Sequence, residues 1–185
     1  MRSRLASRFA AIFLTGTVLT SACTTSGAEQ PAPVTVSVPP LPPPAAKNDS
    51  LGATSFASHW MDLVDYGYQT LDAGPLRGLA AASCQACSRF VAQLDQDKVA
   101  GATYQGGRIH FLSATPTDTR DGNSTVTVLF DQDELKVVDS AGRTSETVPA
   151  NRTIFVFELN WAGTAWRTTA LKLGVENTAS PTPGK

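Results

Sequence analysis

Charged residues and cysteines are scarce in this sequence of 185 residues. Asp, Glu, Lys and Arg together make up 17% of the chain, against about 25% in an ordinary soluble domain. The 15 Lys and Arg residues are balanced by 16 Asp and Glu residues, which gives a net charge of −1 at pH 7. This balance argues against a broad nucleic-acid-binding surface, which would need clustered basic residues. We therefore expect no nucleic-acid partner.

Motifs of nucleotide-binding and hydrolytic enzymes are also missing. The sequence contains no P-loop, no glycine-rich dinucleotide fingerprint, no nucleophile elbow and no H-E-x-x-H zinc motif. Its two histidines, His59 and His110, lie far apart along the chain, which leaves little material for acid–base catalysis or for a metal site. We expect no cofactor and no metal, and we favour binding over catalysis without excluding an enzyme.

Three cysteines are present, and they cannot all pair within one chain, so one needs a separate role. Residues 2–8 carry three arginines, and residues 9–19 form an apolar stretch of 11 residues. That is the length of a signal-peptide core and is short of the about 20 residues that span a bilayer. The small residues Ser21 and Ala22 stand directly before Cys23.

This segment resembles the lipobox of bacterial lipoproteins, whose cysteine receives a diacylglyceryl group and becomes the N-terminus after cleavage. Thr20 stands where that pattern prefers Leu, Val or Ile, and an ordinary secretory signal is the alternative. The resemblance implies a signal peptide at 1–22, lipidation of Cys23 with acyl chains such as palmitate, and anchoring to the outer face of the plasma membrane. Cleavage would remove three of the 15 basic residues and leave 12 against 16 acidic ones, so attachment would depend on the lipid.

Proline, alanine, serine and threonine dominate the residues after Cys23, and seven of the 12 prolines lie between residues 24 and 50. Such a composition cannot bury a core and favours an extended polyproline conformation. We therefore predict a lipid-anchored linker at 23–50, with a ligand for a proline-binding domain as the alternative. The polar end of the chain predicts a disordered tail at 176–185, which leaves one domain at 51–175.

The first half of this domain has apolar residues at helical spacing. The helices and N-caps predicted from this pattern are 56–71 after Thr54 or Ser55, Pro75–Ala82, and 84–99 after Ser83. The second half changes to short β-rich runs separated by Gly and Asn turns. The strands predicted there are Ala102–Gln105, Arg108–Thr115, 125–130, Leu135–Val138, 152–159 and Trp166–Leu173. Helices followed by antiparallel strands predict an α+β domain with the N-terminal helices packed on a curved antiparallel sheet.

This order, with the helical segment F-A-S-H-W-M-D-L-V-D-Y-G-Y-Q-T-L-D, resembles the nuclear-transport-factor-2-like, or cystatin-like, cone fold. With C-Q-A-C following and a lipobox upstream, the chain resembles more narrowly a family of actinobacterial lipoproteins of unknown function. In that family a T-G-D-like element leads to the C-x-x-C, and Leu71 stands here in place of the glycine. The resemblance implies a fold and a location in the cell envelope, and no activity.

Cys84 and Cys87 stand one helical turn apart at the start of the third predicted helix. This arrangement occurs in thiol oxidoreductases, where the helix N-terminus stabilises a thiolate. A redox motif of that type would follow a strand, whereas a helical segment precedes it here. We therefore favour a structural disulfide, which an extracytoplasmic compartment permits, and keep redox exchange as the alternative.

Two further groups of residues have two interpretations each. His59, Asp62 and Asp65 on the first helix fit a solvated helix face, which we favour, or a proton-abstracting His–Asp pair in a cavity. His110 should point to solvent, because Ile109 and Phe111 beside it alternate to the opposite face. The aromatic residues fit a core, but some could also form a pocket with a polar edge. The candidate pocket residues are His59, Tyr66, Tyr104 and Trp161.

Taken together, the sequence predicts a membrane-anchored extracytoplasmic lipoprotein whose domain binds a protein or a small-molecule ligand in the cell envelope. The alternative is a thiol–disulfide redox protein that uses Cys84 and Cys87.

Overall fold

The computed structural model describes residues 36–174 of the chain. In this part, helical segments come first and strands follow. The helical segments are the 3-10 helix η1 (Pro43–Ala46) and the α-helices α1 (Ser50–Thr70), α2 (Gly74–Arg77) and α3 (Gln85–Val99). The strands are β1 (Thr103–Gly106), β2 (Ile109–Arg120), β3 (Asn123–Gln132), β4 (Leu135–Val138), β5 (Thr144–Val148), β6 (Asn151–Trp161) and β7 (Trp166–Leu173).

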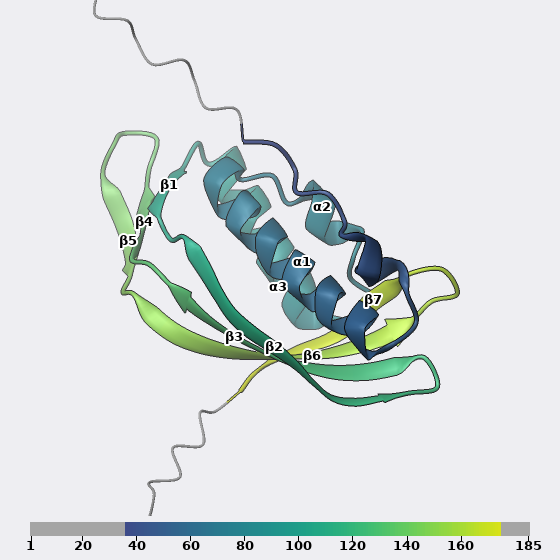
Figure 1. Cartoon of the computed structure of the whole chain (residues 1–185). Coiled ribbons are helices and arrows are strands. Elements are labelled where there is room, and N and C mark those ends of the chain that lie inside the picture. The colour runs from purple at the N-terminus through teal and green to yellow at the C-terminus, as the bar shows by residue number, and fades with distance from the viewer. Residues whose placement is uncertain (1–35, 175–185) are drawn as a thin grey trace, which may run out of the picture. The chain divides into compact units, whose positions relative to one another are not determined.

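The strands pair antiparallel in two sheets. The larger sheet has the order β2-β3-β6-β7 and the smaller one has the order β1-β4-β5. Figure 1 shows α1 and α3 on the concave face of the larger sheet, with β1, β4 and β5 at one of its ends. The expected fold class, α+β with N-terminal helices on a curved antiparallel sheet, is confirmed.

The core lies between α1 and the inner face of the larger sheet. Alternate residues of β3, namely Val126, Val128 and Phe130, are 0 to 2% exposed, as period-two packing of a strand on helices requires. The ring of Trp60 on α1 meets Phe157 of β6 edge-on, with 5.3 Å between the ring centroids. Burial of such an aromatic side chain stabilises a fold by about 2 to 3 kcal/mol.

The helix α1 begins earlier than its apolar pattern predicted. The Asp49 carboxylate accepts a hydrogen bond from the Gly52 amide at 2.7 Å, so Asp49 is the N-cap. The prediction of Thr54 or Ser55 as the N-cap was wrong, because both residues lie within the helix. The Thr54 hydroxyl instead donates to the Ser50 carbonyl inside the helix.

The segment before α1 belongs to the domain from η1 onward. Ala45 is 1% exposed and is part of the core. The Lys47 carbonyl accepts a hydrogen bond from the indole Nε1 of Trp166 at 2.8 Å. The predicted linker at 23–50 therefore cannot extend past residue 42, because short side chains near residue 45 pack where we expected an extended chain. The predicted signal peptide, Cys23 and the predicted tail lie outside the described residues.

At the end of α1, Leu71 stands where the resemblance led us to expect a glycine. Leu71 has a left-handed backbone with φ 51°, and its amide donates to the Gly67 carbonyl at 2.8 Å. A left-handed residue at a helix end is usually glycine, which carries no steric penalty there. The leucine side chain is 7% exposed, so its burial in the core offsets part of the backbone strain.

The chain after α2 lies against β7 instead of continuing as a helix. The predicted helix Pro75–Ala82 was too long, since α2 ends at Arg77. The Thr168 amide donates to the Leu79 carbonyl, and the Ala81 amide donates to the Thr168 carbonyl, both at 2.9 Å. Pairing with the strand satisfies backbone groups that a longer helix would have satisfied internally.

The largest departures from the strand predictions are at β5 and β2. The strand β5 was not predicted, because its residues T-S-E-T-V are polar and mostly exposed. The strand β2 continues to Arg120, five residues beyond the predicted end, through a polar and largely exposed stretch.

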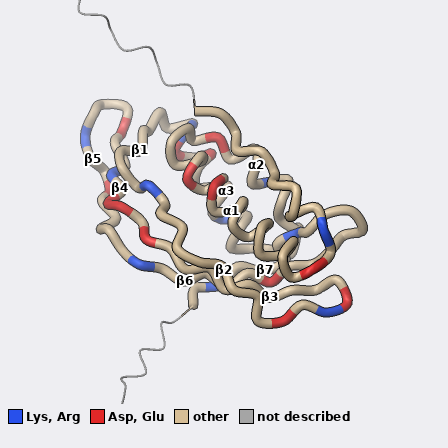
Figure 2. The backbone as a smooth tube through the Cα atoms, viewed as in Figure 1, with Lys and Arg blue, Asp and Glu red and all other residues tan. Residues whose placement is uncertain are grey.

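Among residues 36–174, none of the helices combines the length and the apolar character that a membrane span needs. Figure 2 shows acidic residues on α1 and α3, and α1 contains no Lys or Arg.

Candidate functional site

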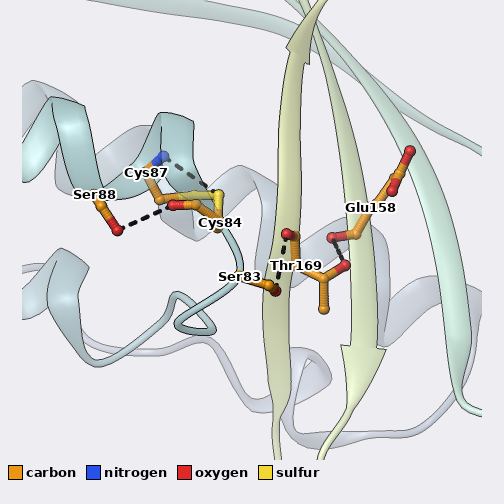
Figure 3. The surroundings of a disulfide bond; sticks show 6 residues. All are labelled: Ser83, Cys84, Cys87, Ser88, Glu158 and Thr169. Atoms are coloured by element: carbon orange, nitrogen blue, oxygen red, sulfur yellow. Dashed lines mark hydrogen bonds between the residues drawn. A yellow bond between two sulfur atoms is a disulfide. The ribbon is translucent and has the colours of Figure 1, made fainter.

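Cys84 and Cys87 form a disulfide at the start of α3 (Figure 3). The Cys84 sulfur accepts a hydrogen bond from the Cys87 amide at 3.3 Å, so Cys84 is the N-cap of α3. Ser83, the predicted N-cap, donates instead to the Thr169 carbonyl of β7 at 3.3 Å. The Ser88 hydroxyl donates to the Cys84 carbonyl at 3.1 Å. The disulfide thus closes the first turn of α3 beside the loop that pairs with β7.

Both cysteines of this disulfide are 1% exposed. Thiol–disulfide exchange requires a thiolate to reach one of the two sulfurs. Burial of both residues obstructs that approach and favours the structural interpretation over redox exchange.

His59 is buried, contrary to our expectation of a solvated helix face. It is 4% exposed, and its Nδ1 atom has no hydrogen-bond partner among the described atoms. Burial lowers the pKa of His59 below its ordinary value of 6.5. The prediction failed because α1 contacts η1 and α2 as well as β2 and β3, so it is covered on more than its single apolar stripe.

Asp62 and Asp65 differ from each other. Asp62 is exposed as expected, and partial burial together with the nearby charge of Asp65 raises its pKa. Asp65 joins α1 to the sheet, because its Oδ1 atom accepts a hydrogen bond from the Ile109 amide at 3.0 Å. Its Oδ2 atom lies 3.2 Å from the Arg108 guanidinium. None of the cavities described in residues 36–174 is lined by Asp62 or His59, so no His–Asp pair is placed for proton abstraction there.

The four residues of the predicted pocket do not surround one described cavity. Tyr66 is buried, with 8% of its surface exposed, and His59 is buried as well. Trp161 packs edge-on against Trp166, with 5.5 Å between the ring centroids. Tyr104 lines a described cavity. His110 is exposed as expected and lies 3.0 Å from the Asp133 carboxylate.

The cavity at Tyr104 has a volume of about 270 Å³ and lies between the helices and the smaller sheet. The ends of α1 and α3 supply one side, and β1, β4 and β5 supply the other. We call it the tyrosine–carboxylate cavity. Its ten lining residues are Tyr68, Phe90, Gln93, Leu94, Asp97, Tyr104, Leu135, Val137, Glu146 and Val148.

Three aromatic rings and one carboxylate that is held by hydrogen bonds line this cavity. The Tyr68 ring centroid lies 5.7 Å from those of Phe90 and Tyr104, at interplanar angles of 53° and 59°. The Tyr104 hydroxyl donates to Oδ2 of Asp97 at 2.5 Å, and Gln93 donates to the same oxygen at 3.0 Å. The three rings are thus contiguous, and hydrogen bonds from two residues hold the carboxylate in place.

Both phenols of the cavity have raised pKa values. Burial raises the pKa of Tyr104 far above its ordinary value, and the hydrogen bond to Asp97 and the charges of Asp97 and Glu146 raise it further. Burial also raises the pKa of Tyr68, against a smaller lowering by its hydrogen bond to Gln132. None of the ten lining residues is basic.

Sequence reasoning found Tyr104 and missed the carboxylates beside it. The short connection from α3 to β1 brings Asp97 within reach of Tyr104, seven residues later, and that spacing could have been noticed. Glu146 could not have been found, because it lies on the unpredicted strand β5.

In two other cavities most of the charged lining residues are paired. One of about 380 Å³ at the β2–β3 hairpin is lined by charged residues that include Asp118, Arg120 and Glu158, but Arg120 pairs with Asp118 and Lys172 pairs with Glu158. The other, about 350 Å³ beside Cys87, has its two lining charges paired, since Arg77 binds Asp95. Among residues 36–174, no group of three or more His, Cys, Asp or Glu residues could hold a metal ion.

Comparison with known proteins gives a family and a fold. The model of a family of unknown function, DUF6318, matches residues 25–172. No curated protein matches the chain. The intermembrane space region of the chloroplast protein ARC6 has a similar structure, with 13% identity and a TM-score of 0.50 over 68% of this chain and 95% of that chain. An uncharacterized protein with a cystatin-like fold from Caulobacter vibrioides is 11% identical, with a TM-score of 0.45 over 69% of this chain and 93% of that one.

Proposed function

The chain belongs to the family of unknown function DUF6318, and we propose that it is a lipid-anchored extracytoplasmic protein that binds a ligand in the tyrosine–carboxylate cavity. The observation that carries the binding role is the set of residues lining this cavity, where contiguous aromatic rings meet a carboxylate held by Tyr104 and Gln93. Ligand sites of this kind combine apolar and aromatic walls with a few fixed polar groups.

The anchor rests on the sequence before the domain. The basic and apolar residues before Cys23 resemble the signal of bacterial lipoproteins, and a diacylglyceryl group carries the two acyl chains needed for stable attachment. Residues 24–42 would act as an extended spacer of roughly 3.1 Å per residue. The domain would then stand outside the cytoplasm, off the outer face of the plasma membrane.

Membrane fractionation and mass spectrometry test the anchor. The native chain should sediment with membranes and carry diacylglyceryl on Cys23, whereas Cys23→Ala should appear in the soluble fraction. Thr24→Ala, one residue further along, is the matched control and should stay with the membrane. Sedimentation of Cys23→Ala with the membranes would contradict the anchor.

The groups in the cavity favour binding over catalysis. Hydrogen bonds from Tyr104 and Gln93 fix the Asp97 carboxylate in place as a binding group, and none of the ten lining residues is a histidine, the most frequent general base. The raised pKa of Tyr104 keeps its phenol protonated near neutral pH. The redox alternative loses support because Cys84 and Cys87 are both buried.

A thermal-shift screen with a fragment set of mixed charge tests the binding role. Fragments that stabilise the full chain in detergent should lose their effect in Tyr104→Leu, which removes a wall of the cavity. Asp118→Asn, at the hairpin cavity, should leave the effect unchanged. Fragments that stabilise Tyr104→Leu as well as the wild type would show that they bind elsewhere and would contradict the proposal.

A further inference from the structure

The chemistry of the tyrosine–carboxylate cavity selects among ligand classes. We propose, building on the binding role above, that the cavity accepts an organic cation, namely an ammonium group on a short alkyl chain. The lining includes Asp97 from α3 and Glu146 from β5, and none of its ten residues is basic. Two carboxylates from different elements therefore border one cavity without a lining counter-charge.

The ring arrangement suits the same ligand class. A cation is attracted to the face of Tyr or Phe when it lies within about 6 Å of the ring centroid. Tyr68, Phe90 and Tyr104 all line the cavity, and adjacent centroids are 5.7 Å apart. The rings are tilted at 53° and 59° to one another, so they line the cavity in different orientations.

The carboxylates make neutral and anionic ligands unfavourable. A ligand that excludes water from Asp97 and Glu146 imposes a desolvation cost on both charges. A cation compensates for this cost, a neutral group of the same shape does not, and an anion adds repulsion. The hydrogen bonds from Tyr104 and Gln93 already hold Asp97, so little side-chain order has to be gained on binding.

The volume limits the size of the bound group. At about 270 Å³, the cavity is smaller than the roughly 300 to 1,000 Å³ typical of sites for drug-sized ligands. It suits a head group or the end of a side chain. A methylated ammonium on a small molecule and the terminal ammonium of a lysine side chain share this chemistry.

Titration calorimetry on the full chain in a maltoside detergent tests the ligand class. Choline supplies a trimethylammonium group, n-butylammonium mimics a lysine side chain, and 3,3-dimethyl-1-butanol is the neutral isostere of choline. We expect at least one cation to bind about tenfold more tightly than the neutral isostere. The tighter of the two cations identifies the source of the group, and either result supports the inference.

Matched variants connect the affinity to the cavity. Asp97→Asn should weaken cation binding about tenfold, whereas Asp95→Asn, on the same helix but outside this cavity, should not. Tyr104→Leu should abolish the preference for the cation, and Tyr104→Phe should retain it because the ring remains. Melting curves of all four variants establish that they are folded.

Three results would overturn the inference. One such result is that choline and its neutral isostere bind with equal affinity and that Tyr104→Leu abolishes both. The cavity would then be a binding site, but the preference for a cation would be refuted. Failure of both cations to bind, while other fragments remain sensitive to Tyr104→Leu, would do the same. If neither probes nor fragments respond to Tyr104→Leu, the binding role fails together with the ligand class.

Discussion

At the scale of single residues, a few buried polar atoms are without partners while partly buried carboxylates connect the elements. Among the described residues, Nδ1 of His59, Nε1 of Trp60 and Oγ1 of Thr168 are buried without a hydrogen bond. Each such group costs about 1 to 3 kcal/mol. Asp65 and Asp97, by contrast, link α1 to β2 and α3 to β1, so the polar groups that organise this domain lie at its margins.

His59 should make stability depend on pH. Burial lowers its pKa in the folded state below 6.5, so below that value the unfolded chain binds a proton that the folded chain does not. The free energy of unfolding should therefore fall as the pH drops from about 7.5 to about 5.5. His59→Leu should reduce this fall, as measured by urea unfolding at both pH values.

The carboxylates with lowered pKa values do not interfere in this window. Asp131 and Asp139 are held below 3.8 mainly by hydrogen bonds from Arg152 and Arg143, so they titrate in more acid solution. An unchanged pH dependence in His59→Leu would show that His59 is not the group responsible.

Candidate residues were harder to predict than their secondary structure. An apolar stripe predicts which side of a helix faces one partner, but α1 has neighbours on several sides, so His59 is buried and not solvated. Tyr104 was predicted as a pocket residue and lines a cavity, yet its neighbours come from α1, α3 and the unpredicted β5. Sequence periodicity within one element carries no information about such a junction.

At the scale of elements, capping and close approach set the boundaries. The strands β4 and β7 have the predicted ends, whereas α2 is shorter than predicted because the loop that follows it pairs with β7. The start of α1 was hidden because Asp49 caps a first turn whose buried residues, Gly52 and Ala53, are small. Elements with apolar patterns were therefore predicted well, and those stabilised by tertiary contacts were not.

The close approach of η1 to α1 predicts an unusual glycine effect. A Cβ at Gly52 would lie 2.0 Å from the Lys47 carbonyl oxygen. Gly52→Ala should therefore lower the free energy of unfolding by at least about 1 kcal/mol, although alanine normally stabilises a helix relative to glycine.

Gly78→Ala is the matched control for this substitution. Its Cβ would meet the Pro75 carbonyl oxygen at 3.7 Å, an ordinary contact. Chemical denaturation should show a neutral or slightly stabilising effect there. Equal effects at the two glycines would contradict the packing of residues 43–49 against α1.

The disulfide of α3 should resist cellular reductants. Both cysteines are 1% exposed, and structural disulfides usually have reduction potentials below about −300 mV. Incubation in a glutathione buffer with a potential of about −230 mV should produce no free thiols, as measured by a thiol-labelling assay. Reduction of half of the disulfide at about −200 mV would instead support the redox alternative.

At the scale of the whole molecule, the fold positions a small cavity where the helical layer meets the smaller sheet. The fold class followed from the order of helices and strands alone, because that order leaves few ways to bury the apolar faces. The cavity could not be predicted from that order, since it depends on residues of α1 and α3 and on three short strands. The proposed anchor and spacer would present this cavity outside the cytoplasm.

The most direct test of the binding role is NMR mapping of the binding site. Backbone amide shifts of the full chain in detergent should be followed while choline or n-butylammonium, whichever binds more tightly, is added. We expect the largest shifts at residues lining the tyrosine–carboxylate cavity, such as Leu94, Tyr104 and Val137. Largest shifts at the β2–β3 hairpin or beside the Cys84–Cys87 disulfide, or no shifts at all, would contradict the binding role.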